Sequence, residues 1–188
     1  MNFLDNRLNL NVAYFHINEY NIAEARADGT IDQANGMTSY GAEFSARARI
    51  RQRVNAYASY GYTQATFGTF ILPGYFNPDV DVNLAGFVPP LVPKHTERVW
   101  VTYDLPKGLN VSVGQRYISQ RATDIYDLFW MPGYTMFEAQ VLYRAGRIEY
   151  ALNAFNLFNK RYYVSSIDDT QVYPGPPINV TGTIRVRF

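Results

Sequence analysis

The sequence predicts an all-β fold, namely an antiparallel transmembrane β-barrel segment of about eight strands. Three observations predict it. Apolar and polar residues alternate with a period of two along most of the chain. Short and long connections alternate between the expected strands, as they do in membrane barrels. Aromatic residues make up 16% of the 188 residues, with 16 Tyr and 12 Phe, which suits a surface that is apolar on one side and wet on the other.

Three strands are expected in the first part of the chain, at residues 8–14, 40–50 and 54–63. The second of them shows the alternation most clearly. Its one face carries Tyr40, Ala42, Phe44, Ala46, Ala48 and Ile50, and its other face carries Gly41, Glu43, Ser45, Arg47 and Arg49. Because successive side chains of a strand point to opposite faces, this strand has one apolar and one charged side.

Five more strands are expected, at residues 98–104, 109–117, 137–144, 148–154 and 180–188. Each places Val, Ile, Leu, Ala, Phe or Tyr on one face and polar residues, several of them arginine, on the other. Trp100 interrupts the polar face of its strand. A two-faced strand of this kind fits a wall that has lipid on one side and a polar lumen on the other.

The connections between these strands differ sharply in length. Tight turns are expected near 51–53, 104–108 and 144–147, and long loops at 23–37, 67–94, 120–132 and 164–177. A soluble domain rarely contains such long loops, so a soluble β-sandwich, which also alternates, is the weaker interpretation. Tyrosines near strand ends are expected to form girdles at the two membrane interfaces: Tyr40, Tyr60, Tyr62, Tyr117, Tyr143 and Tyr162.

The composition excludes several classes of function. A net charge of +1 creates no field that would attract nucleic acid. The chain has no cysteine, which excludes thiol chemistry and cysteine-bound metals. No apolar run is long enough for a transmembrane helix. No signal peptide precedes the patterned sequence, so we expect the chain to lack its natural N-terminus.

No catalytic constellation, cofactor or metal site is expected, and the protein is not expected to be an enzyme. His16 and His95 have no partners at the spacing of metal ligands and are expected at strand ends or in solvent. Three acidic pairs in the loops could hold a divalent cation, although solvated loop charges are the simpler interpretation. These pairs are Asp79/Asp81, Asp124/Asp127 and Asp168/Asp169.

The C-terminal third carries a recognisable order of motifs. Residues 132–163 read PGYTMFEAQVLYRAGRIEYALNAFNLFNKRYY, and the chain closes with PGPPINVTGTIRVRF. This resembles the end of the TonB-dependent outer-membrane receptors of the ferric siderophore type. The residues that match the family's C-terminal signature are Asn156, Leu157, Phe158, Lys160, Tyr162 and Phe188. Upstream, Ser39-Tyr40-Gly41-Ala42-Glu43 resembles the Gly-x-Glu strand of that family, and Pro93-Lys94-His95 resembles its usual re-entry into the barrel after a long loop.

The resemblance implies a location in the bacterial outer membrane and a barrel of 22 strands that encloses an N-terminal plug. Residues 1–188 would then be the C-terminal portion of the barrel domain, with the plug and the earlier strands absent. The chain would begin after a periplasmic turn and first run outward. The implied partners are outer-membrane lipid, a ferric siderophore, the TonB–ExbB–ExbD complex through the missing N-terminal part, and the barrel assembly machinery through Phe188.

Aromatic side chains in the expected outer loops are the candidate ligand contacts, because their rings could stack on a planar iron chelate. Two arginines could neutralise an anionic chelate. The candidates are Tyr75, Phe76, Arg116, Arg121, Tyr126, Phe129, Trp130 and Tyr163, together with Phe87 and Tyr173. The competing interpretation is that these rings pack the loops on one another.

The resemblance thus implies energy-coupled uptake of a ferric siderophore, with this chain supplying barrel wall and part of the binding rim. The alternative is a self-contained small eight-stranded outer-membrane barrel with a structural or adhesive role. As an isolated chain, the 188 residues are not expected to transport anything, because the plug that would gate the lumen is not among them.

Overall fold

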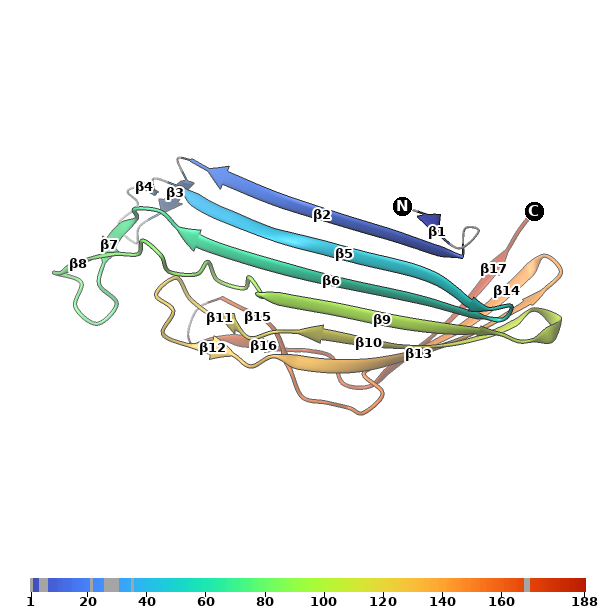
Figure 1. The fold of residues 1–188 in the computed structure, drawn as a ribbon. Coiled ribbons are helices and arrows are strands. Elements are labelled where there is room, and N and C mark those ends of the chain that lie inside the picture. Colours follow the sequence, from blue (N-terminus) through green and yellow to red (C-terminus); the bar gives the residue numbers. More distant parts are fainter. Residues whose placement is uncertain (1, 4–6, 21, 26–30, 35, 168–169) are drawn as a thin grey trace.

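The structure, a computed structural model, describes residues 2–3, 7–20, 22–25, 31–34, 36–167 and 170–188. Its centre is one antiparallel sheet of nine strands in the order β1-β2-β5-β6-β9-β10-β13-β14-β17. The strands lie side by side in chain order, and the sheet curls so that β14 and β17 lie behind the first strands (Figure 1). This fold confirms the all-β barrel prediction.

All eight expected strands are present, and each is close to its predicted range. Their bounds are β2 Leu8–Glu19, β5 Met37–Arg51, β6 Val54–Phe67, β9 His95–Asp104, β10 Leu109–Ile118, β13 Tyr134–Ala145, β14 Ile148–Phe155 and β17 Asn179–Val186. The ninth strand, β1 (Asn2–Phe3), pairs with the first residues of β2. Among the described residues, β17 pairs with β14 and with neither β1 nor β2, so the sheet is an open arc.

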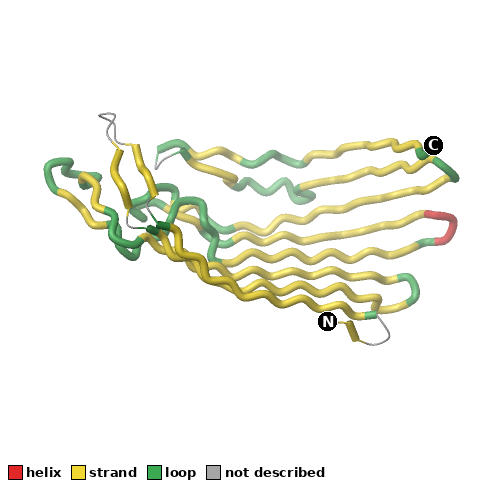
Figure 2. The backbone as a smooth tube through the Cα atoms, turned by 90° about the horizontal axis from the view of Figure 1, so that it is seen from above, coloured by secondary structure: helices red, strands yellow, loops and turns green. Residues whose placement is uncertain are grey.

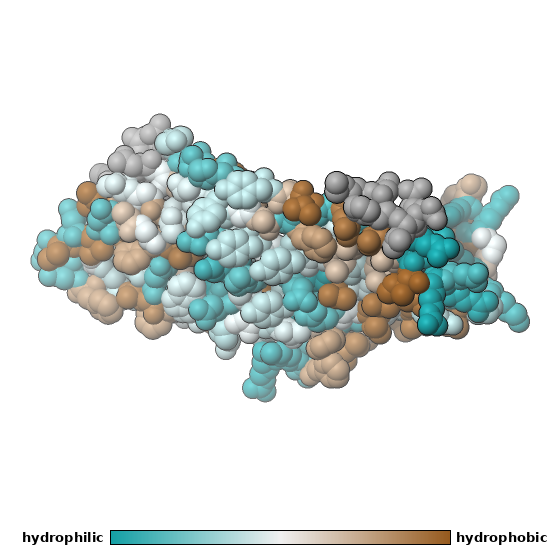
Figure 3. Space-filling view, viewed as in Figure 1, coloured by the Kyte–Doolittle hydropathy of each residue, from teal (hydrophilic) through white to brown (hydrophobic). Residues whose placement is uncertain are grey.

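The pairing register places the predicted apolar residues on one face of the sheet. Val12 lies opposite Phe44, which lies opposite Tyr60. Val12 is 76% exposed because no described part of the chain covers it on this face. Hydrophobic residues gather over the middle of the strands, and hydrophilic residues gather at the end where the turns lie (Figure 3). An exposed apolar band with tyrosines near its margins is the surface that a bilayer requires.

The opposite face is polar, as predicted. Arg98 forms an ion pair with Glu138, with 3.3 Å between Nη2 and Oε2. Trp100 interrupts this face, and its ring covers Gly114 on the neighbouring strand. A Cβ at Gly114 would lie 1.9 Å from the Trp100 ring, so only glycine leaves room for the indole. The polar face is therefore a packed wall of mixed arginine, amide, hydroxyl and aromatic groups.

The predicted alternation of connections is confirmed. The short turns, one of which contains the three-residue 3-10 helix η1 (Pro106–Gly108), lie at one end of the sheet, and the long loops lie at the other (Figure 2). We call these the turn end and the loop end. Among the described residues, no helix has the length and apolar character needed to cross a membrane.

The long loops contain structure that the alternation did not predict. Each holds a two-stranded antiparallel sheet: β3–β4 (Ile22–Ala25, Ile31–Ala34), β7–β8 (Ile71–Pro73, Asp81–Asn83), β11–β12 (Arg121–Ala122, Trp130–Met131) and β15–β16 (Tyr163–Ser166, Val172–Pro174). Strands of two to four residues are too short to show a period in the sequence. Parts of the predicted loops 23–37 and 164–177, including Asp168/Asp169, lie outside the described residues.

Two small hydrophobic cores lie at the loop end among the residues that the structure describes. Phe70, Leu72 and Leu84 form the first core, with Phe87 and Tyr126 packed against it. The second core consists of Tyr134, Met136 and Tyr162, with Ile118 beside it. Tyr162 is 8% exposed and its ring lies against Gly175. The prediction that Tyr162 belongs to an interfacial girdle is therefore wrong, because its ring packs inside the loop end and does not face lipid.

Candidate ligand-binding surface at the loop end

Loops 67–94 and 120–132 pack against each other at the loop end. The backbone N–H of Val88 donates to Asp127 Oδ2 at 2.8 Å. The hydroxyl of Tyr126 donates to the carbonyl of Pro73, also at 2.8 Å. The first hydrophobic core lies between the same loops. Because backbone and side-chain contacts both join them, the two loops form one shaped surface.

Four of the candidate aromatic residues meet on this surface, and we call them the aromatic loop patch: Tyr75, Phe76, Phe87 and Tyr126. Tyr75 lies edge-on to Phe76, with ring centroids 4.9 Å apart, and to Tyr126, at 5.7 Å. Together with Val80, Val82 and Leu128 they line a cavity of about 300 Å³. Phe76 is 83% exposed. The patch therefore combines packed rings with one ring that stands in solvent.

Two ionisable groups beside the patch are shifted toward their protonated forms. Burial, together with the nearby Asp124 carboxylate, raises the pKa of Tyr126. Burial also raises the pKa of Asp127, an effect that the Val88 hydrogen bond partly offsets. Asp124 itself accepts hydrogen bonds from the backbone N–H groups of Tyr126 and Phe129. Tyr126 thus stays a neutral hydrogen-bond donor at physiological pH.

The other candidate aromatic residues lie outside this patch. Phe129 and Trp130 are exposed on loop 120–132, and the Trp130 indole N–H donates to the carbonyl of Asp127 at 3.0 Å. Tyr163 and Tyr173 lie on the β15–β16 hairpin and are exposed there. The structure therefore brings together only part of the set that the sequence singled out.

The two candidate arginines lie in different settings. Arg121 is 5% exposed, and its guanidinium donates to the carbonyls of Tyr163 and Val164 and lies over the Tyr134 ring. It joins two loops and is buried away from the surface that an anionic chelate would reach. Arg116 lies in β10 beside Arg98, on the polar face of the wall. The loops therefore offer aromatic surface without a free guanidinium from Arg121.

The C-terminal signature has a structural role. Asn156 has a φ of 51° and sits where β14 ends. Its side-chain amide donates to the carbonyls of Lys160 and Pro176, and its Oδ1 accepts from the Lys160 N–H. Phe158 packs edge-on against Phe137, with ring centroids 5.2 Å apart. These residues close the strand end and direct the following loop back over Tyr162.

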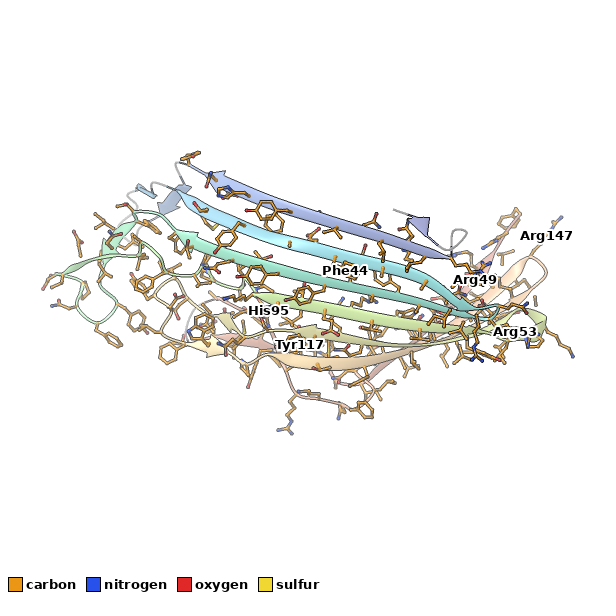
Figure 4. All side chains as sticks on the ribbon, viewed as in Figure 1. Phe44, Arg49, Arg53, His95, Tyr117 and Arg147 are labelled. Carbon is orange, nitrogen blue, oxygen red and sulfur yellow. The ribbon has the colours of Figure 1, made fainter. Side chains whose placement is uncertain are left out.

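The turn end has a different chemistry. Arginines converge there from several strands, as the labelled Arg49, Arg53 and Arg147 show (Figure 4). Glu149 accepts from Arg144 and Arg185 and lies within 3.5 Å of Arg187. A separate hollow of about 550 Å³ is lined by Arg7, Arg47, Arg49, Asn55, Tyr57 and Trp100, among others.

No cluster of three or more metal-ligating side chains occurs in the described part of the chain. His95 begins β9, at a strand end as predicted, and its Nδ1 lies 2.8 Å from the hydroxyl of Tyr60. His16 lies opposite Tyr40 near the end of β2.

Sequence reasoning missed several apolar neighbours of the aromatic loop patch. Val80, Val82 and Leu128 line its cavity. The period-2 spacing of Val80 and Val82 was the available signal, but it is too short to indicate a strand by itself.

The chain is similar to known proteins over most of its length. The family model described as "TonB dependent receptor-like, beta-barrel" matches residues 1–159. The ferrichrome outer membrane transporter/phage receptor of Escherichia coli K12 is 28% identical over 187 residues, covering 94% of this chain and 24% of the transporter. The chain spans about a quarter of the length of the curated relatives that it matches.

Solved structures of outer-membrane receptors are also similar to this chain. The siderophore receptor PiuA from Acinetobacter baumannii superposes with a TM-score of 0.81 over 98% of this chain and 27% of its own, at 23% identity, which shows a shared fold. The ferric-catecholate import receptor Fiu from Escherichia coli K12, in its closed form, has a TM-score of 0.71 and 26% identity. That match covers 98% of this chain and 26% of Fiu.

Proposed function

Because the chain belongs to the TonB-dependent receptor β-barrel family of the bacterial outer membrane, we propose that it forms part of a receptor that binds a ferric siderophore and imports it. The observation that carries the proposal is the aromatic loop patch, which stands on packed loops at the end of the wall where ligands arrive. Binding and import need no catalysis, so the protein acts as a receptor and transporter.

The aromatic loop patch fits a chelate with planar aromatic or apolar parts. The exposed ring of Phe76 and the rings of Tyr75 and Tyr126 can stack on such a ligand. The Tyr126 hydroxyl is engaged with Pro73, which holds its ring in place. Packed loops lose little conformational entropy on binding, so this surface is pre-organised. Phe129, Trp130 and Tyr163 are proposed as outer contacts that a larger chelate reaches.

The proposed partners follow from the family. Lipid covers the apolar face of the wall, and the TonB–ExbB–ExbD complex supplies energy through a part of the protein outside this chain. Phe188 is fully exposed at the turn end, where the barrel assembly machinery can reach it. The open sheet supports a wall segment over the small eight-stranded barrel, because a closed barrel needs β17 to pair with the first strands.

The proposal is tested with the full-length receptor in a strain that lacks its own copy. Growth is measured with one ferric chelate at a time as the sole iron source, and binding is measured by fluorescence quenching of the purified receptor. We expect one chelate to support growth and to bind. We expect Phe76→Ala to weaken binding about tenfold, in line with the loss of a stacking contact.

The matched control is Phe158→Ala. Phe158 is also a strongly exposed phenylalanine at the loop end, but it packs on Phe137 and lies outside the aromatic loop patch. Binding by this variant should stay at the unmodified level. Failure of every ferric chelate to support growth or to bind would contradict the proposed function. Equal weakening of binding by both variants would show that the aromatic loop patch is not the binding surface.

A further inference from the structure

Each of the three short turns carries at least one cation. The β5–β6 turn has Arg51 and Arg53, the β9–β10 turn has Lys107, and the β13–β14 turn has Arg147. We call these four residues the turn cations. All four are exposed, and Arg53 and Arg147 are labelled at the turn end of the wall (Figure 4). In the part of the chain that the structure describes, no ion pair joins a turn cation to a carboxylate.

The two carboxylates that stand beside these turns in the sequence already have partners. Glu149 is shared by three arginines of the polar face. Asp104 accepts hydrogen bonds from the side-chain amides of Asn55 and Asn110. Because both carboxylates are engaged in this way, the turn cations remain available to an anion from outside the wall.

A β-bulge turns Arg51 toward the apolar face of the wall. The pairing of β5 with β6 shifts its register between Arg49 and Arg51. Arg49 lies opposite Asn55 on the polar face, whereas Arg51 lies opposite Val54. Directly opposite residues share a face, and Val54 belongs to the apolar series of β6 that contains Tyr60. An arginine at the margin of an apolar surface lays its aliphatic stem on that surface and keeps its guanidinium among polar groups.

Tyrosines on the apolar face give the depth of Arg51 in the membrane. Val54, the partner of Arg51, also lies opposite Tyr103, which is 45% exposed. Tyr143 and Tyr150 lie opposite each other on the same face and stack, with ring centroids 6.3 Å apart. Exposed tyrosines of a membrane wall mark the boundary between hydrocarbon and headgroups. Arg51 therefore lies in the row of residues at that boundary.

The other turn cations lie just beyond the same boundary. Lys107 is two residues from Leu109, which lies opposite Tyr143. Arg147 is three residues from Tyr150. Three residues of extended chain span at most about 10 Å, and lysine and arginine side chains are long enough to bridge much of that distance. The turn cations therefore reach the headgroup layer of the leaflet at the turn end.

We propose that the turn cations bind the phosphate groups of anionic phospholipids in the leaflet at the turn end. Lysines and arginines at a membrane surface attract anionic lipids, and a guanidinium can donate two hydrogen bonds to one phosphate. A phospholipid fits better than an acidic protein because Arg51 lies on the apolar face, where the acyl chains of the same lipid would lie against Val54 and Tyr103. The proposal does not depend on the imported chelate, so it can fail while the proposed function stands.

The test uses the full-length receptor, purified in detergent and freed of lipid. The receptor is titrated with phosphatidylglycerol, or with phosphatidylcholine of the same acyl chains, and native mass spectrometry measures the apparent Kd of each lipid. We expect the anionic lipid to bind about tenfold more tightly. Arg51→Gln combined with Arg53→Gln should lower this preference about threefold, because two of the four turn cations are lost. Inorganic phosphate should displace little of the bound lipid.

The matched control is Arg47→Gln combined with Arg49→Gln, which removes two exposed charges from the polar face of the same strand and should leave the preference unchanged. Lys107→Gln combined with Arg147→Gln is the second test pair if the first does not fold, as judged by heat-modifiable migration on a gel. Three results would overturn the proposal: no preference for the anionic lipid, which would favour an acidic protein as the partner; equal losses in the test and control pairs; or full displacement of the lipid by inorganic phosphate.

Discussion

The two ends of this wall differ in the length of their connections, in charge and in the burial of hydrophobic side chains. The turn end has short connections and many cations: Arg7, Arg47, Arg49, Arg51, Arg53, Lys107, Arg144, Arg147, Arg185 and Arg187. The loop end has long connections, two hydrophobic cores and the carboxylates Asp79, Asp81, Asp124 and Asp127. Turns of a few residues hold their shape by backbone geometry, whereas long loops keep a shape only if they bury side chains. The loop end can therefore present a fixed binding surface.

The largest expected effect comes from removing the centre of the first loop core. Leu84 is fully buried, so Leu84→Ala should lower the local stability of loops 67–94 and 120–132 by about 3 kcal/mol. Hydrogen exchange of the amides in residues 70–87 of the full-length receptor measures this loss. Val80→Ala, at a position that is 54% exposed, is the control and should change little. Equal protection in Leu84→Ala and the unmodified receptor would show that the core does not hold the loops.

The next effect concerns the turn that follows β14. Asn156→Ala removes three hydrogen bonds and places alanine at a positive φ, so we expect a loss of about 2 kcal/mol. The thermal midpoint of the full-length receptor, followed by heat-modifiable migration, measures it. Asn159→Ala also changes a residue at positive φ but removes one hydrogen bond, to the Ile178 N–H, and should cost less. A larger loss for Asn159→Ala would contradict this account of the signature.

A smaller effect on stability is expected at the turn end, where ion pairs join neighbouring strands. Glu149→Gln removes the carboxylate that three arginines share, so the thermal midpoint should fall at low salt. Because those arginines are mostly exposed, screening by salt should shrink the difference. Thermal midpoints at low and high salt concentrations measure this dependence. A loss that is the same at both concentrations would mean that packing, and not charge, accounts for the role of Glu149.

The smallest effect is a pH dependence at the loop end. Burial raises the pKa of Asp127, so the packed loops are favoured while this carboxyl is protonated and weaken as pH rises from its ordinary value of 3.8 through the raised value. Asp127→Asn keeps an acceptor for the Val88 N–H and removes the charge. Protease resistance of the loops across this range should then depend less on pH. Asp79→Asn, at an exposed position, should leave the pH profile unchanged.

The strands of the wall and the loops at its end also differ in how far the sequence predicts their structure. The eight strands and their faces were predictable because each residue meets either lipid or the polar face, which imposes a period of two. The β7–β8 and β11–β12 hairpins were not predictable, because strands of two or three residues are too short to show a period.

The candidate site was predictable only as a set of residue types. Tyr75, Phe76 and Tyr126 come together because loops 67–94 and 120–132 pack, which no local pattern indicates. The burial of Arg121 by the carbonyls of another loop is a long-range contact of the same kind.

The central claim is that the loop end faces the medium and receives the ligand, while the turn end faces the periplasm. Introduced cysteines test it most directly, because this chain has none of its own. A membrane-impermeant maleimide is applied to intact cells that carry the full-length receptor with Phe76→Cys or Lys107→Cys. We expect labelling of Phe76→Cys on intact cells, blocked by the bound chelate, and labelling of Lys107→Cys only after the outer membrane is opened. Labelling of Lys107→Cys on intact cells, with Phe76→Cys protected, would contradict the account.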